Sequence, residues 1–160
     1  MLIQSNSVEV FCNPKGKALR SLLPFKVGDL ISVILGTVVD YNDPKVDYRS
    51  LQIDVNKYLI VEKNSPEECI NHSCDPNCQI LFENDRIYLY VIKDIVVGDE
   101  LTFNYNSTEY DMGKDVFVCL CESPNCVKEV KGYKYLTEEQ KSLIASQLAP
   151  YLKEKVNVVG

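Results

Sequence analysis

Three cysteines lie within eight residues, as Cys119, Cys121 and Cys126. Thiolates at such close spacing are typical ligands of Zn²⁺, which prefers four ligands in a tetrahedral arrangement. Three local thiols leave the site one ligand short, so the fourth must come from another part of the chain. Cys74 and Cys78 are both candidates, and a metal held in this way would fasten the tail over the core.

The chain has seven cysteines, and an odd number fits poorly with a fully paired disulfide framework. The N-terminal residues show no basic segment followed by an apolar stretch, so we expect no signal peptide and an intracellular, reducing location. In that setting clustered cysteines are read as metal ligands before disulfides. Isolated intracellular cysteines are more often reduced and buried, and we expect this for Cys12, Cys69 and Cys78.

A second polar segment, Asn71–Cys78, contains the only histidine of the chain, His72. Asn71 and His72 offer two side chains and two adjacent backbone amides in a turn held by Pro76. Such a turn can present donors and acceptors to an adenine edge and an amino-acid headgroup. Taken alone the pattern is weak, because a single histidine in a turn is more often a structural residue.

A third segment runs from Gly98 to Tyr105 and ends in the short apolar stretch Leu101–Tyr105. In this order and spacing, the three segments resemble the SET-domain protein lysine methyltransferases with a zinc-binding post-SET segment. The resemblance implies a mainly β fold of small curved sheets with a pseudoknot. It also implies transfer of a methyl group from S-adenosylmethionine to the ε-amine of a lysine.

The resemblance assigns roles to individual residues. It makes Cys74, directly after Asn-His-Ser, the fourth zinc ligand, and it makes Tyr105 the catalytic tyrosine. Asn104 stands where aspartate is more common in the family, which leaves the tyrosine hydroxyl in place. The opening Gly-x-Gly turn of the family corresponds to Lys15–Ala18, with Ala18 in place of the second glycine. Contact with the cofactor is implied for Lys15, Gly16, Lys17, Ala18, Asn71, His72, Tyr105 and Leu120.

The lysine channel departs from the family pattern. Phe103 corresponds to the position that sets how many methyl groups fit. Ile34 stands where many members carry a channel tyrosine, so it supplies no hydroxyl, and Tyr48 or Tyr41 is the candidate to replace it. These departures leave the reaction class unchanged and the substrate open.

Short apolar runs separated by turns predict a β-rich domain over residues 8–118, followed by a cysteine-rich segment 119–130. Leu51–Val55 and Lys57–Val61 are expected to form a hairpin. Residues 131–160 should form a helical extension, because Thr137–Gln140 is a capping box and the apolar residues that follow share one helical face. Pro150 should end or kink that helix.

The amino-acid composition restricts the classes of binding partner that we expect. The 160 residues carry a net charge of −6, which favours a basic protein or peptide and argues against direct binding of nucleic acid. No apolar run is long enough to span a membrane. We expect a cytoplasmic protein, or a nuclear one in a eukaryote. Two other functions stay open: a SET-like binding module without catalysis, and a methyltransferase that acts on a non-histone protein or a small amine.

Overall fold

The computed structural model describes residues 6–159, and within helix α2 the side chains as far as Asn157. The chain starts with a hairpin of β1 (Val8–Asn13) and β2 (Gly16–Ser21), which pair antiparallel in full register. Gly16 adopts a φ of +107°, which glycine takes readily and other residues do not.

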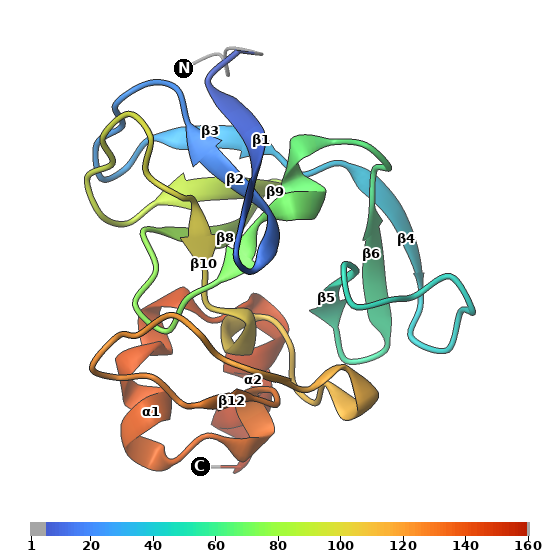
Figure 1. The fold of residues 1–160 in the computed structure, drawn as a ribbon. Helices are drawn as coiled ribbons and strands as arrows, with labels where there is room; N and C mark the ends of the chain where they lie inside the picture. Colours follow the sequence, from blue (N-terminus) through green and yellow to red (C-terminus); the bar gives the residue numbers. More distant parts are fainter. Residues whose placement is uncertain (1–5, 160) are drawn as a thin grey trace.

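Two antiparallel three-stranded sheets follow (Figure 1). The first has the order β3-β9-β8, and the second has the order β4-β6-β5. The hairpin predicted over residues 51–61 is confirmed as β5 and β6. The strand bounds are β3 (Leu30–Val33), β4 (Gly36–Asp40), β5 (Leu51–Asp54), β6 (Lys57–Val61), β8 (Cys78–Glu83) and β9 (Arg86–Val91).

The β-branched run over residues 30–39 passes from one sheet to the other. Ile34 N–H donates to the Ile87 carbonyl at 2.7 Å, whereas Leu35 C=O accepts from Glu62. Gly36 then lies against strand β6, where a Cβ atom would stand 2.1 Å from the Ile60 carbonyl oxygen. Glycine therefore permits the close approach by which the chain leaves the first sheet after β3 and pairs with β6 as strand β4.

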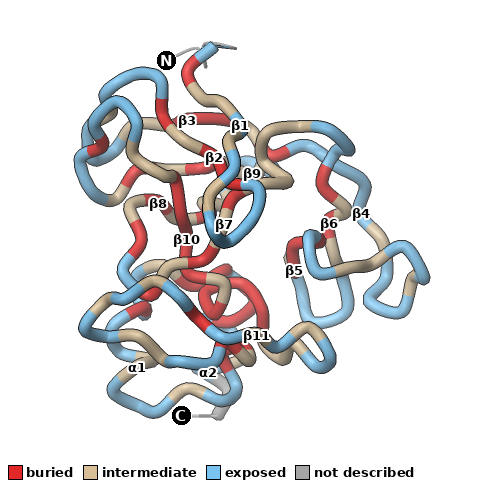
Figure 2. Tube along the Cα trace, viewed as in Figure 1, coloured by how far each residue is buried: buried red, intermediate tan, exposed pale blue. Residues whose placement is uncertain are grey.

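Two short ladders connect distant segments. β7 (Asn71–His72) pairs parallel with β10 (Thr102–Phe103), and β11 (Phe117–Val118) pairs antiparallel with β12 (Glu129–Val130). The main apolar core lies between the first sheet, β6 and the strand β10, and it includes Leu19, Ile31, Leu89 and Leu101, each nearly inaccessible to solvent. Figure 2 shows buried residues along β10 and into the segment after it.

The C-terminal part forms a second, smaller core beneath β10 (Figure 1). The capping box at Thr137 and Gln140 is confirmed, and it opens α1 (Glu138–Leu143). The single helix expected here is instead two helices, because Pro150 is the first residue of α2 (Pro150–Val159). Proline suits this position since its missing N–H has no helical partner there.

The 3₁₀ turns are η1 (Pro66–Cys69), η2 (Tyr105–Ser107), η3 (Gly113–Asp115), η4 (Tyr133–Tyr135) and η5 (Ala145–Gln147).

Among the described residues, no helix combines the length and apolar character that crossing a membrane requires.

Candidate active site and metal centre

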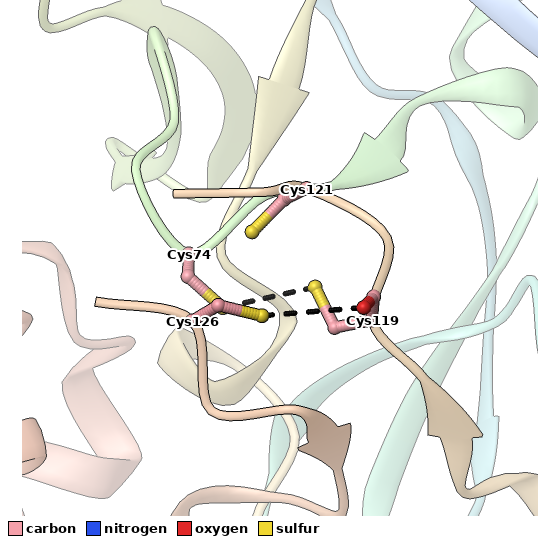
Figure 3. A group of neighbouring side chains, drawn as sticks. All are labelled: Cys74, Cys119, Cys121 and Cys126. Atoms are coloured by element: carbon pink, nitrogen blue, oxygen red, sulfur yellow. Dashed lines mark hydrogen bonds between the residues drawn. The ribbon is translucent and has the colours of Figure 1, made fainter. Parts of the chain in front are cut away.

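Four cysteine side chains converge between the tail and the core (Figure 3). The sulfur atoms of Cys74, Cys119, Cys121 and Cys126 all lie within 4.8 Å of one another, and those of Cys74 and Cys119 are 3.8 Å apart. Tetrahedral zinc with bonds of about 2.3 Å would place its sulfur ligands about 3.8 Å apart. The group therefore has the size and chemistry of a Cys₄ zinc site.

Zinc binds these residues as thiolates, so their pKa values bear on metal binding. Burial raises the pKa of Cys119 to about 11 and raises the pKa of Cys74 above its usual range. Burial acts on Cys121 as well, but hydrogen bonds from Ser123 lower its pKa to about 6. Cys78, the rival fourth ligand, lies fully buried in β8 outside the group.

The His72 side chain connects this cysteine group to Tyr105. Its Nδ1 atom accepts a hydrogen bond from Tyr105 N–H at 3.0 Å, and its Nε2 atom lies 3.2 Å from Cys74 Sγ. Burial, with a smaller effect of Lys15, lowers the pKa of His72 to about 3, so the ring is neutral near pH 7. With Nδ1 as acceptor, the proton is assigned to Nε2, where it points at the sulfur. The His72 ring therefore contacts both the sulfur of Cys74 and the backbone of Tyr105.

The parallel ladder of β7 and β10 brings the second and third sequence segments together. Asn71 pairs with Thr102, His72 pairs with Phe103, and Ser73 N–H donates to the Phe103 carbonyl at 3.1 Å. A parallel pair cannot be closed by a short turn, so only the path of the chain places these residues side by side.

The Tyr105 ring lies in an aromatic cluster. Its centroid is 4.8 Å from that of Phe103, 5.4 Å from His72 and 5.9 Å from Phe117. The hydroxyl donates to the Ile70 carbonyl at 2.6 Å. Burial, together with nearby acidic groups, raises the pKa of Tyr105 above its ordinary range, so the phenol keeps its proton.

Asn71 joins the first hairpin to this cluster. Its Nδ2 atom donates to the Lys17 carbonyl and to Glu100 Oε1, each at 3.1 Å. Glu100 also accepts from Asn13 and from Lys15 Nζ, both at 3.3 Å. The Gly16 turn and Asn71 therefore lie at one place, although 54 residues separate Lys17 from Asn71.

The channel candidates fall into different surroundings. Phe103 and Ile34 belong to the main core, and Tyr105 packs against that core. Tyr48 is 70% exposed, with the Arg49 guanidinium 5.5 Å from its ring. Leu120, between two of the cysteines, is 61% exposed and presents an apolar side chain beside the metal centre.

Two residues of the site were not anticipated from the sequence. Glu100 lies in the third segment, but its role as a shared acceptor for the hairpin and Asn71 depends on a contact across the fold. Phe117 comes two residues before Cys119, and nothing in the sequence pattern indicated that its ring would reach Tyr105 and His72.

The SET domain family model matches residues 9–106, which is more than half of the chain. The chain therefore belongs to the SET-domain family, as the resemblance predicted, and its mainly β fold is the fold of that family. The match covers the hairpin, both sheets and the segment through Asn106.

Several curated proteins are similar to this chain. It is 32% identical over 143 residues to "Methyltransferase flvH" of Aspergillus flavus, covering 88% of this chain and 75% of that protein. It is 30% identical over 140 residues to the "Histone-lysine N-methyltransferase, H3 lysine-36 specific" of Homo sapiens, and 29% identical over 139 residues to the protein of that name from Cryptococcus neoformans. Each of these two alignments covers 77% of this chain, but the chain spans only 5% and 16% of those proteins.

Two solved structures are similar in fold to this chain. The crystal structure of KRYPTONITE in complex with mCHG DNA and SAH matches with a TM-score of 0.62 and 26% identity, covering 76% of this chain and 28% of that one. A second KRYPTONITE structure, with mCHH DNA, an H3(1-15) peptide and SAH, matches with a TM-score of 0.61 and 25% identity, covering 81% of this chain and 30% of that one.

Proposed function

We propose that this chain is an S-adenosylmethionine-dependent protein lysine methyltransferase. The observation that carries the proposal is the parallel β7–β10 ladder, which joins Asn71, His72 and Tyr105 beside the Gly16 turn and the four cysteines. Relatives named as methyltransferases, and SAH in two similar structures, support the same reaction class.

The residues present fit the cofactor. No atom beyond its chain neighbours lies within 4 Å of a Cβ built on Gly16, so the turn leaves open space for a ligand. Asn71 is bonded to the Lys17 carbonyl next to that turn, and Leu120 offers an exposed apolar side chain. We assign cofactor binding to Lys15, Gly16, Lys17, Ala18, Asn71, His72, Tyr105 and Leu120.

S-adenosylmethionine supplies an activated methyl group as a sulfonium, so the chain has to align the acceptor amine and exclude water. Tyr105 has the chemistry for the first task, because its phenol is neutral and its oxygen is already fixed by the Ile70 carbonyl. The apolar walls of Phe103 and Ile34 favour the neutral form of an incoming lysine, since burial lowers an amine pKa. Tyr48 is the proposed outer residue of this channel.

We assign zinc to Cys74, Cys119, Cys121 and Cys126, with a structural role. A closed site of four thiolates leaves no open position for catalysis, and it ties the tail to the core. The division into a SET domain over residues 8–118, a post-SET segment over 119–130 and a helical extension over 131–160 stays a prediction.

A basic protein or peptide is the proposed acceptor, which the net charge of −6 supports. An H3 peptide is present in one similar structure, and several relatives are named as acting on histone H3. For a histone acceptor we propose a nuclear location. The lack of direct nucleic-acid binding stays a prediction. Another amine is the second candidate acceptor, and flvH, of which this chain covers 75%, is named only as a methyltransferase.

Incubation with labelled S-adenosylmethionine, recombinant histone H3, other basic proteins and small polyamines, read by mass spectrometry, tests both candidates. Tyr105→Phe is the matched control, since it removes one oxygen and little volume. It should lower kcat by about 10²-fold, as for loss of one oriented polar group in a transition state, while calorimetry shows cofactor binding unchanged. Cofactor binding without turnover on any acceptor would instead support a binding module.

A further inference from the structure

The segment that follows Tyr105 is held at every residue by the C-terminal part of the chain. Gly132 N–H donates to Asn106 Oδ1 at 3.0 Å, and Ala149 N–H donates to the Ser107 carbonyl at 2.8 Å. The Tyr151 hydroxyl donates to the Thr108 carbonyl. Tyr133 N–H donates to the Glu109 carbonyl at 2.8 Å, and Lys134 N–H donates to the Tyr110 carbonyl at 3.0 Å.

These bonds lie in a dry region. Asn106, Ser107 and Thr108 are completely buried, and Tyr151 is 6% exposed. A buried carbonyl that loses its donor cannot recover the bond from water, so each contact fixes its residue strongly. The five contacts use no zinc ligand, so the C-terminal unit, residues 132–151, holds this segment independently of the metal centre.

The segment is in turn bonded to the catalytic tyrosine. The Tyr105 carbonyl accepts from Thr108 N–H at 3.2 Å and from Glu109 N–H at 2.9 Å, and the Thr108 hydroxyl, which donates to Glu109 Oε2, lies 3.3 Å from it. Tyr151 therefore reaches Tyr105 through one intervening residue, Thr108. On its other side, Tyr105 is bonded to His72 and Ile70.

We propose that the C-terminal unit is part of the catalytic apparatus, and that Tyr151 is a positioning residue that sets the place of Tyr105 through Thr108. The proposal rests on the methyltransferase function proposed above and adds a residue to it from outside the SET domain match, which ends at residue 106. Most of the proposed cofactor residues lie in the first hairpin or, like Asn71, are bonded to it, so loosening Thr108 should act on turnover far more than on cofactor affinity.

Tyr151→Phe tests this, because it removes only the donating hydroxyl. The assay uses the acceptor identified by the panel above at 10 °C, and the fraction of folded protein is measured by circular dichroism. We expect kcat per folded molecule to fall about tenfold, since a small misplacement of a catalytic group lowers the rate strongly. The affinity for S-adenosylhomocysteine by calorimetry and the zinc content should change less than twofold. Tyr135→Phe is the matched control: it removes a hydroxyl that bonds Asp111 on the exposed side of the same unit, and it should leave kcat unchanged.

A double-mutant cycle separates positioning from general loosening. If Tyr151 acts through Tyr105, the loss caused by Tyr151→Phe should shrink to less than about twofold in the Tyr105→Phe background. A loss of equal size in both backgrounds, or an unchanged kcat in the single variant, overturns the positioning role while the proposed function stands. Absence of turnover by the wild-type chain on every acceptor overturns both.

Should Tyr151→Phe not fold at 10 °C, Thr108→Val takes its place. It keeps the Tyr151 ring and removes the hydroxyl that donates to Glu109 at 2.7 Å and lies 3.3 Å from the Tyr105 carbonyl, so it loosens the Thr108 turn beside Tyr105. The same fall in kcat without loss of cofactor affinity is expected, and an unchanged kcat overturns the proposal.

Discussion

Glu109 is a buried carboxyl whose charge has no partner of opposite sign, and its replacement by glutamine should change how stability depends on pH. It accepts hydrogen bonds from Gln52 N–H at 3.1 Å and from the Thr108 hydroxyl at 2.7 Å. None of the salt bridges found among residues 6–159 involves it. Burial raises the pKa of Glu109 from 4.5 to about 7, against the effect of both hydrogen bonds.

Whether stability rises or falls with pH depends on which state, folded or unfolded, binds the Glu109 proton more tightly. Between pH 4.5 and about 7 the folded chain holds the Glu109 proton while the unfolded chain has released it, so stability falls as pH rises through this window. At about 1.4 kcal/mol per pH unit, the full loss is about 3 kcal/mol and is complete above pH 8. Glu109→Gln removes the charge and keeps the shape, so it should be more stable than the wild type by about 2–3 kcal/mol at pH 8.5 and about equal to it at pH 5.

Urea unfolding of both proteins at half-unit steps between pH 5 and 8.5, with zinc in excess, measures the difference directly. Other groups, including His72, titrate equally in both proteins and cancel in that difference. Glu139→Gln is the matched control, because it makes the same chemical change at an exposed position of α1. A pH-independent difference for Glu109→Gln would show that the Glu109 pKa is not raised in the folded protein.

Three further outcomes are expected. Cys121→Ser should release one zinc ion per chain, read by mass spectrometry of the native protein, and disorder residues 119–130 while the β-sheet signal in circular dichroism persists; retention of the metal would exclude Cys121 as a ligand. Asn71→Ala should weaken S-adenosylhomocysteine binding by about 1–3 kcal/mol in calorimetry, because it removes one polar partner from the proposed cofactor site; unchanged affinity would remove Asn71 from the site. Phe103→Tyr should shift products toward monomethyl-lysine in mass spectrometry, because the added hydroxyl takes up channel space; an unchanged product ratio would place Phe103 outside the channel.

The sequence alone determined the family, the reaction class to propose and the metal ligands to expect. The family, the reaction class and Cys74 followed from the resemblance, whereas local chemistry suffices for the other three ligands, since Cys119, Cys121 and Cys126 are close in any conformation of so short a segment. The capping box at Thr137 and the hairpin over residues 51–61 were also predictable, because both depend on near neighbours in the chain.

Contacts between distant segments were decided only by the tertiary structure. The choice of Cys74 over Cys78 rested on resemblance until the fold placed one sulfur in the group and buried the other in β8. The passage of residues 30–39 between two sheets depends on how closely Gly36 approaches β6, which no local propensity reports. The link from Tyr151 through Thr108 to Tyr105 spans 46 positions, and no periodicity or spacing connects residues so far apart.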